Sequence, residues 1–94
     1  MYRFALTPNA QRQLEHEIAY SRKKWGTAHA SQYRRELMKR VRAIAKNPKL
    51  YTVNAELGEN IRSVRYKGNY IIYQIDEPQK LVVIAGFPSV YKLK

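Results

Sequence analysis

Residues 61–87, IRSVRYKGNYIIYQIDEPQKLVVIAGF, decide the fold because they hold three apolar segments separated by two turns. The three segments are 61–66, which alternates weakly, and 70–75 and 81–87, which are rich in the β-branched and aromatic residues typical of strands. The first turn contains Gly68 and the second contains Pro78, two residue types that favour turns. Strands joined by such short turns pair antiparallel. The stretch therefore predicts a small antiparallel sheet.

Two helical segments precede this sheet. Thr7-Pro8 favours a helix start, because Thr can cap a helix and Pro at its first position needs no hydrogen-bond donor. Apolar residues then recur at helical spacing over 8–25 and again over 28–46, and Gly26 separates the two stripes. Trp25 continues the first stripe, so we expect it in the core. The pattern predicts a helical hairpin.

Residues 2–6 alternate as a short strand, which completes the order βααβββ. This order predicts an α+β protein with a single domain spanning 1–94. In it the N-terminal strand and the helical hairpin pack on one face of the antiparallel sheet. Two helices cover only one face, yet both faces of the best strands are apolar: Tyr70 and Ile72 alternate with Ile71 and Tyr73, and Val82 and Ile84 alternate with Leu81 and Val83. Either loops and the tail cover the second face, or a partner does.

Composition excludes several classes of protein. The 94 residues contain no Cys, which excludes disulfides, a thiol nucleophile and cysteine-based metal sites. His16 and His29 are the only histidines, and we expect both to be exposed, so the sequence predicts neither a metal site nor a cofactor. No apolar run is long enough for a membrane helix or a signal peptide. We therefore expect a cytoplasmic protein without membrane contact.

The net charge of +11 indicates a polyanionic partner. Most of the excess positive charge lies in residues 22–49. This segment contains ten Lys and Arg residues and a single acid, Glu36, so its net charge is +9. Only Glu36 offers a helical partner, to Arg40, so the remaining like charges repel. The cations of the second helix form either a solvated surface or a site for an acidic protein or nucleic acid: Arg34, Arg35, Lys39, Arg40, Arg42 and Lys46.

Three features resemble a known family when read in order. Trp25-Gly26 ends the first helical segment, Asn47-Pro48 ends the second, and IRSVRYKGNYIIYQI places Tyr73 in an aromatic-aliphatic strand after an Arg-containing one. Together with the length and the charge, they resemble the RelE/ParE superfamily of type II toxins, which are small basic proteins encoded beside acidic antitoxins. The resemblance implies a growth-arresting toxin, of the kind that stabilises plasmids, and a cognate acidic antitoxin as its partner.

The superfamily contains two activities, and the sequence departs from one of them. Ribosome-dependent mRNA-cleaving members usually carry an Arg where Ile71 stands, and a His or Lys followed by Arg where Phe87 and Pro88 stand. A ribonuclease requires proton-transfer groups and cations that converge on a phosphate. ParE-type members, which inhibit DNA gyrase, do not require them, although the His that they often carry near Phe87 is absent here too. The sequence favours gyrase, with DNA as a second contact; the alternatives are an endoribonuclease acting on ribosome and mRNA, and a degenerate, non-toxic homologue.

Two groups of site residues follow from the resemblance and the charge pattern. The expected target contacts are Arg62, Arg65, Lys67, Tyr91, Lys92 and Lys94, of which Arg62, Arg65, Tyr91 and Lys92 would supply the chemistry in a nuclease. Both parts of this set have a structural alternative. The cations of the strand could serve only to discourage edge-to-edge aggregation, and the C-terminal residues could form only a frayed terminus. The expected antitoxin contacts are Tyr33, Arg35, Leu37, Arg42, Tyr70, Ile72, Val82 and Ile84.

Overall fold

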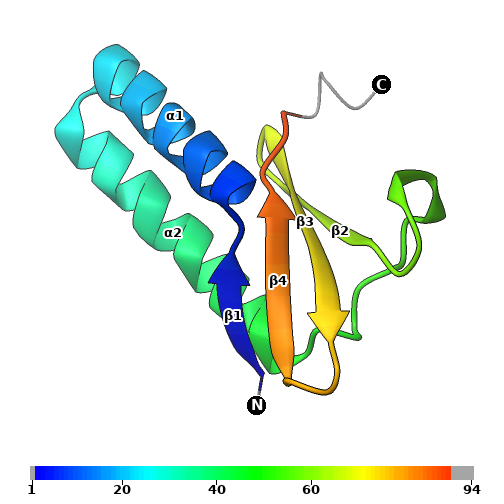
Figure 1. Cartoon of the computed structure of the whole chain (residues 1–94). Coiled ribbons are helices and arrows are strands. Elements are labelled where there is room, and N and C mark those ends of the chain that lie inside the picture. Colours follow the sequence, from blue (N-terminus) through cyan, green and yellow to red (C-terminus); the bar gives the residue numbers. More distant parts are fainter. Residues whose placement is uncertain (1, 90–94) are drawn as a thin grey trace.

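The computed structural model describes residues 2–89 and has the predicted α+β order (Figure 1). Its elements are β1 (Arg3–Leu6), α1 (Pro8–Trp25), α2 (Thr27–Lys46), the short 3-10 helix η1 (Ala55–Leu57), β2 (Arg62–Tyr66), β3 (Asn69–Asp76) and β4 (Leu81–Gly86). The order βααβββ is confirmed, and the observed bounds differ from the expected ones by at most one residue. The short helix η1 lies in a segment where the sequence showed only a loop.

The four strands form one mixed sheet in the order β1-β4-β3-β2. The β2–β3 and β3–β4 pairs are antiparallel, but β1 pairs parallel with β4, with Phe4 opposite Val82. The N-terminal strand is therefore a member of the sheet, whereas the sequence placed it against the face of an antiparallel sheet. The physical reason is that β4 would otherwise expose an edge of unpaired backbone groups, which β1 satisfies.

Helices α1 and α2 form an antiparallel hairpin that covers one face of this sheet (Figure 1). The side chains between the two layers form the core. Its largest members are at most 1% exposed: Leu14, Leu37, Val41, Ile44, Ile71, Tyr73, Val82 and Ile84. Burying such side chains contributes most of the stabilising free energy.

The start of α1 is hydrogen-bonded to the end of β4. Thr7 Oγ1 caps the helix by accepting from the Ala10 N–H at 3.1 Å, and the same hydroxyl donates to the Ala85 carbonyl at 3.1 Å. Further along, Gln13 Oε1 accepts from the Phe87 N–H at 2.5 Å. Gly86 permits this approach, because a Cβ there would lie 2.7 Å from Gln13 Oε1. The first two turns of α1 thus fix where β4 ends.

The expectation that Trp25 lies in the core is wrong. Its side chain is 56% exposed at the tip of the hairpin. An α-helix of 18 residues is about 27 Å long, and the hairpin extends past the strands it covers (Figure 1). The apolar stripe of α1 therefore continues beyond the sheet that could bury it. Gly26, with a φ of 95°, then reverses the chain into α2.

Candidate partner-binding surfaces

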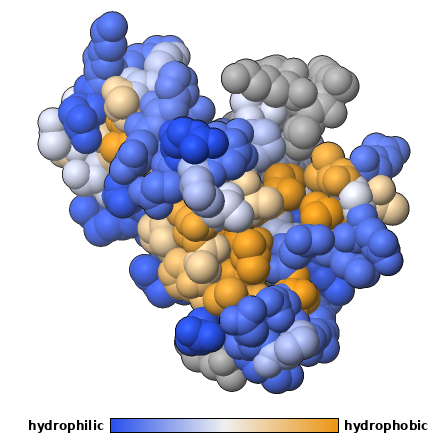
Figure 2. All heavy atoms as spheres, in the orientation of Figure 1, coloured by the Kyte–Doolittle hydropathy of each residue, from blue (hydrophilic) through white to orange (hydrophobic). Residues whose placement is uncertain are grey.

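The face of the sheet opposite the helices is apolar along its two central strands. We call this surface the open sheet face and define it by five half-buried residues: Tyr70, Ile72, Leu81, Val83 and Ala85. Apolar atoms gather over the middle of the sheet in Figure 2. Contiguous apolar surface of this kind marks binding sites on soluble proteins.

The strand register corrects three of the expected antitoxin contacts. Tyr73 lies opposite Ile84 and Ile75 opposite Val82, so the even-numbered side chains of β4 share the helix-covered face with Tyr73. Val82 and Ile84 are therefore fully buried, and Leu37 of α2 is buried in the same core. Tyr70 and Ile72 do lie on the open sheet face. The residues that the sequence missed are Leu81, Val83 and Ala85, whose only signal was the alternation of β4.

The loop after α2 borders the open sheet face without covering its centre. The Gln74 amide on this face donates to the Glu59 carbonyl at 3.3 Å, and Asn54 Nδ2 donates to Ser63 Oγ at 3.5 Å. These contacts lie on the β2 side of the sheet, while Tyr70 and Ile72 stay half-buried. The sequence predicted that loops and the tail could cover this second face. The loop reaches only its β2 edge, and the tail of residues 90–94 lies outside the described residues.

The cations expected to contact the target do not converge. Arg62 and Arg65 are three residues apart on β2 and so lie on opposite faces of the sheet. The Arg62 guanidinium donates to the backbone carbonyls of Tyr51 and, at 3.5 Å, of Lys49. Arg65 is exposed, with its Nε donating to the Lys67 carbonyl at 3.4 Å. The other three expected contacts, Tyr91, Lys92 and Lys94, lie outside the described residues.

We expect Arg62→Met to lower the free energy of unfolding by about 1–2 kcal/mol, because it removes charge-assisted hydrogen bonds to the loop carbonyls. Arg65→Met is the matched control on the same strand, and its effect should stay within about 0.5 kcal/mol. Urea denaturation followed by circular dichroism measures both variants. Equal stability of the two would show that Arg62 does not anchor the loop.

A row of cations runs along the outer face of α2, opposite its buried stripe. We call it the α2 row and define it as Arg35, Lys39, Arg42 and Lys46, spaced by four, three and four residues. Within residues 2–89, none of the four has a carboxylate within 4.0 Å. Three of them, together with Gln32 and Glu36, line a shallow hollow of about 450 Å³. The arrangement is an unneutralised positive surface.

Glu36 pairs with the β2–β3 turn and not with Arg40 as expected. Its carboxylate lies 3.1 Å from Lys67 Nζ, and this hydrogen bond lowers the pKa of Glu36 and raises the pKa of Lys67. Arg40 instead lies over the Tyr66 ring, 6.0 Å from its centroid. The pairing engages the one acid of the basic segment with Lys67, so the α2 row has no carboxylate within ion-pair distance among residues 2–89.

Tyr33 connects α2 to the sheet. Its hydroxyl donates to Asn69 Oδ1 at 3.3 Å, while the buried Asn69 amide donates to the Phe87 carbonyl at 3.0 Å. Burial raises the pKa of Tyr33 to about 12. This expected antitoxin contact is therefore half-buried, and its hydroxyl is already hydrogen-bonded within the toxin.

Two further observations bound the chemistry of residues 2–89. Neither helix there combines the length and the hydropathy required to cross a bilayer. The same residues contain no group of three or more His, Asp or Glu side chains arranged to hold a metal ion.

Comparison with known proteins identifies a matching family model and several solved structures with the same fold. Residues 4–87 match the family model described as the ParE toxin of the type II toxin–antitoxin system parDE. No curated protein matches the sequence significantly.

Solved structures share the fold at low sequence identity. One from the chromosomal ParDE toxin–antitoxin system of P. aeruginosa is 12% identical with a TM-score of 0.81, covering 96% of this chain and 97% of that one. A chain of the intact E. coli RelBE toxin–antitoxin complex is 12% identical with a TM-score of 0.60, covering 96% and 98%. The isolated E. coli RelE toxin is 13% identical with a TM-score of 0.59, covering 99% and 94%.

Proposed function

This chain belongs to the ParE toxin family of type II toxin–antitoxin systems, and on that premise we propose that it arrests growth by inhibiting DNA gyrase and is neutralised by a cognate acidic antitoxin. The family match over residues 4–87 is the observation that carries the proposal. Gyrase is the target that the resemblance to ParE-type toxins implies. The proposal places the protein in the cytoplasm, where gyrase and DNA lie.

The geometry supports a binding protein over an mRNA-cleaving enzyme. Cleavage requires a proton-transfer group and cations that converge on one phosphate. Here the two strand arginines lie on opposite faces, and Arg62 is tied to loop carbonyls. Ile71 and Phe87, at positions where nucleases of the superfamily carry Arg and His or Lys, are 0% and 3% exposed.

A supercoiling assay with purified gyrase tests the proposed target. We expect the toxin to block supercoiling and to stabilise cleaved DNA, and pre-incubation with the antitoxin should restore activity. Translation reactions with ribosomes and mRNA are the parallel arm. Intact gyrase activity at excess toxin would exclude the gyrase target, and codon-positioned mRNA cleavage would assign the nuclease function.

Residues Tyr91, Lys92 and Lys94 belong to the proposed target contact together with Arg65 and Lys67. In the same assays, the variant Tyr91→Phe distinguishes a nuclease from a gyrase inhibitor, because it removes the hydroxyl but keeps the ring. A nuclease that uses this hydroxyl should lose most of its rate. A gyrase inhibitor that uses the ring for stacking should retain most of its potency.

The proposed antitoxin contact joins the open sheet face to the α2 row. The first surface offers apolar burial and the second offers charge complementarity to an acidic chain. Helix α2 lies on the covered face of the sheet (Figure 1). Because the α2 row is opposite the buried stripe of this helix, it lies on the side away from the open sheet face. One antitoxin reaches both surfaces only by passing around an edge of the sheet, which suits a segment that folds on binding.

We expect the double variant Arg35→Glu, Arg42→Glu to associate with the antitoxin about tenfold more slowly and with a weaker salt dependence. The change replaces two exposed cations of the α2 row with anions that repel an acidic chain. Stopped-flow association across salt concentrations measures the effect. The charge-matched control is Arg12→Glu, Lys23→Glu on α1. If the control slows association as much, net charge and not the α2 row steers the encounter.

A further inference from the structure

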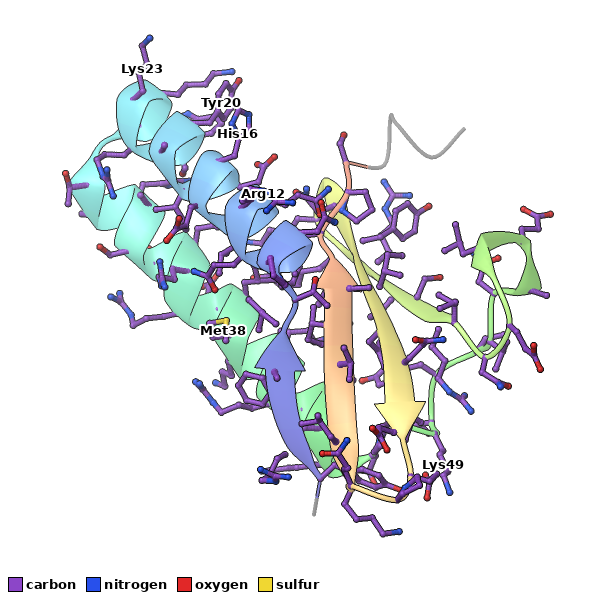
Figure 3. All side chains as sticks on the ribbon, viewed as in Figure 1. Arg12, His16, Tyr20, Lys23, Met38 and Lys49 are labelled. Carbon is purple, nitrogen blue, oxygen red and sulfur yellow. The ribbon has the colours of Figure 1, made fainter. Side chains whose placement is uncertain are left out.

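Cationic and aromatic side chains follow one another along α1 from its second turn to its end, first along one exposed side of the helix and then around its tip, where Trp25 continues the apolar stripe. We call this set the α1 row: Arg12, His16, Tyr20, Lys23, Lys24 and Trp25. All six are exposed, and Figure 3 shows Arg12, His16, Tyr20 and Lys23 following one another along the helix. From the first to the last residue the helix rises about 20 Å. A simple charge count by segments divides this surface, because Arg12 falls in the N-terminal segment with Glu15 and Glu17, and Lys23 and Lys24 fall in the basic segment 22–49.

The tip of the α1 row is an exposed aromatic pair beside a cation. Tyr20 and Trp25 are 51% and 56% exposed and lie edge to face, with ring centroids 6.2 Å apart. Lys24 Nζ lies 4.8 Å from the Trp25 centroid and 3.2 Å from the Tyr20 hydroxyl. Every other Tyr, Phe or Trp within residues 2–89 is buried or half-buried. Cations in the last turn stabilise a helix through its dipole, and Trp25 contacts His29 of α2 with ring centroids 5.1 Å apart. Neither role requires the two rings to be this exposed.

The base of the α1 row opens into a hollow between α1 and the segment after β4. This hollow has a volume of about 440 Å³, within the range of small-ligand pockets. Arg12 and His16 line it from the helix, together with the amides Asn9 and Gln13, and Glu17 is the single acid among the lining residues. Polar donors therefore sit at one end of the row and stacking surfaces at the other.

We propose that the α1 row binds single-stranded nucleic acid, with bases stacked on Trp25 and Tyr20 and phosphates paired with Lys23, Lys24 and Arg12. Aromatic faces beside cations are the combination that single-strand-binding proteins use. A single strand of nucleic acid supplies a base for stacking beside every phosphate, whereas an acidic protein supplies carboxylates without a ring at each of them. A chain of a few nucleotides running from the tip to the hollow matches the order of groups along the helix.

The test titrates the full-length toxin with a fluorescein-labelled (dT)12 oligonucleotide. Trp25 is the only tryptophan, so its fluorescence reports stacking directly, and we expect strong quenching on binding. Trp25→Leu and Tyr20→Leu should each weaken binding by about tenfold in fluorescence anisotropy. Lys23→Gln, Lys24→Gln should reduce the slope of log K against log salt by about 1.4, which corresponds to two phosphate contacts. All four positions are exposed, and circular dichroism checks the fold of each variant.

The matched control is Arg35→Gln, Lys39→Gln, which removes the same charge from the α2 row. This control should keep most of the affinity. Equal losses from both double variants would overturn the proposal, because binding would then follow net charge alone. Binding of poly-glutamate as tight as that of (dT)12, or (dT)12 binding without Trp25 quenching, would also overturn it. Since the titration contains neither gyrase nor ribosome, its failure would leave the proposed target untouched.

Discussion

Val83→Asp should weaken antitoxin binding about 100-fold or more while the toxin stays folded. Val83 lies in the centre of the open sheet face, between Ala5 on β1 and Gln74 on β3. In the free toxin the new carboxylate points to water, because this side chain is only half-buried. In the proposed complex it would be buried without a partner, which costs several kcal/mol, or about a thousandfold at 4 kcal/mol. Isothermal titration with the antitoxin measures the loss.

Val83→Thr is the control, because it keeps the shape and the strand propensity of Val83. Ile72→Asp places a charge at a second position on the same face, and so tests whether the effect belongs to the whole face and not to Val83 alone. In cells, both Asp variants should arrest growth even when the antitoxin is co-expressed. Unchanged antitoxin affinity for the two folded Asp variants would remove the open sheet face from the proposed contact.

Tyr73→Ala should destabilise the protein by about 3–5 kcal/mol, which approaches the whole stability of a small domain. Tyr73 is fully buried, and its hydroxyl donates to the Pro48 carbonyl at 2.7 Å, so it holds the end of α2 against the sheet. Tyr73→Phe separates the two contributions. It keeps the ring and should cost about 1–2 kcal/mol, because the buried carbonyl loses its donor. Urea denaturation measures both, and equal losses would show that the ring adds nothing to the hydroxyl.

The same residue predicts a loss of stability at high pH. Burial raises the pKa of Tyr73 from 10.0 to about 12, so the folded state holds the phenolic proton more tightly than the unfolded chain. Its contribution is therefore complete below pH 10 and disappears as the pH rises from 10 to 12. Tyr73→Phe should flatten the decline of the unfolding free energy over this range. The decline that remains includes Tyr33, whose pKa is raised to about 12 as well.

The helices and strands could be predicted because their signals are local. The 3.6-residue stripes, the cap at Thr7 and the turn at Gly68 each depend on neighbours in the chain. Strand register does not depend on neighbours in the chain. Alternation in β4 shows that Val82 and Val83 face opposite sides of the sheet, but not which of them faces the helices. Only the pairing of Tyr73 with Ile84 decides that orientation. The parallel pairing of β1 with β4 is equally non-local.

The candidate sites were less predictable than the fold for a similar reason. Charge counts identify the α2 row, since its cations are close in sequence. They miss the role of Arg62, because its carbonyl partners lie on a loop more than ten residues away. They also miss the α1 row, because its cations are separated along the chain and Arg12 is followed closely by Glu15 and Glu17. Trp25 was misplaced because a stripe does not show how far the partner sheet extends.

The pairing of β1 with β4 has a consequence for synthesis on the ribosome. Arg3 lies opposite Leu81 and Leu6 opposite Ile84, so the first strand pairs with a segment more than 70 residues later in the chain. Contacts this distant in sequence slow folding, because a long loop must close before they form. A nascent chain lacks the strand that completes its sheet until β4 has left the exit tunnel. Activity that requires the finished sheet can therefore arise only after β4 has emerged from the ribosome.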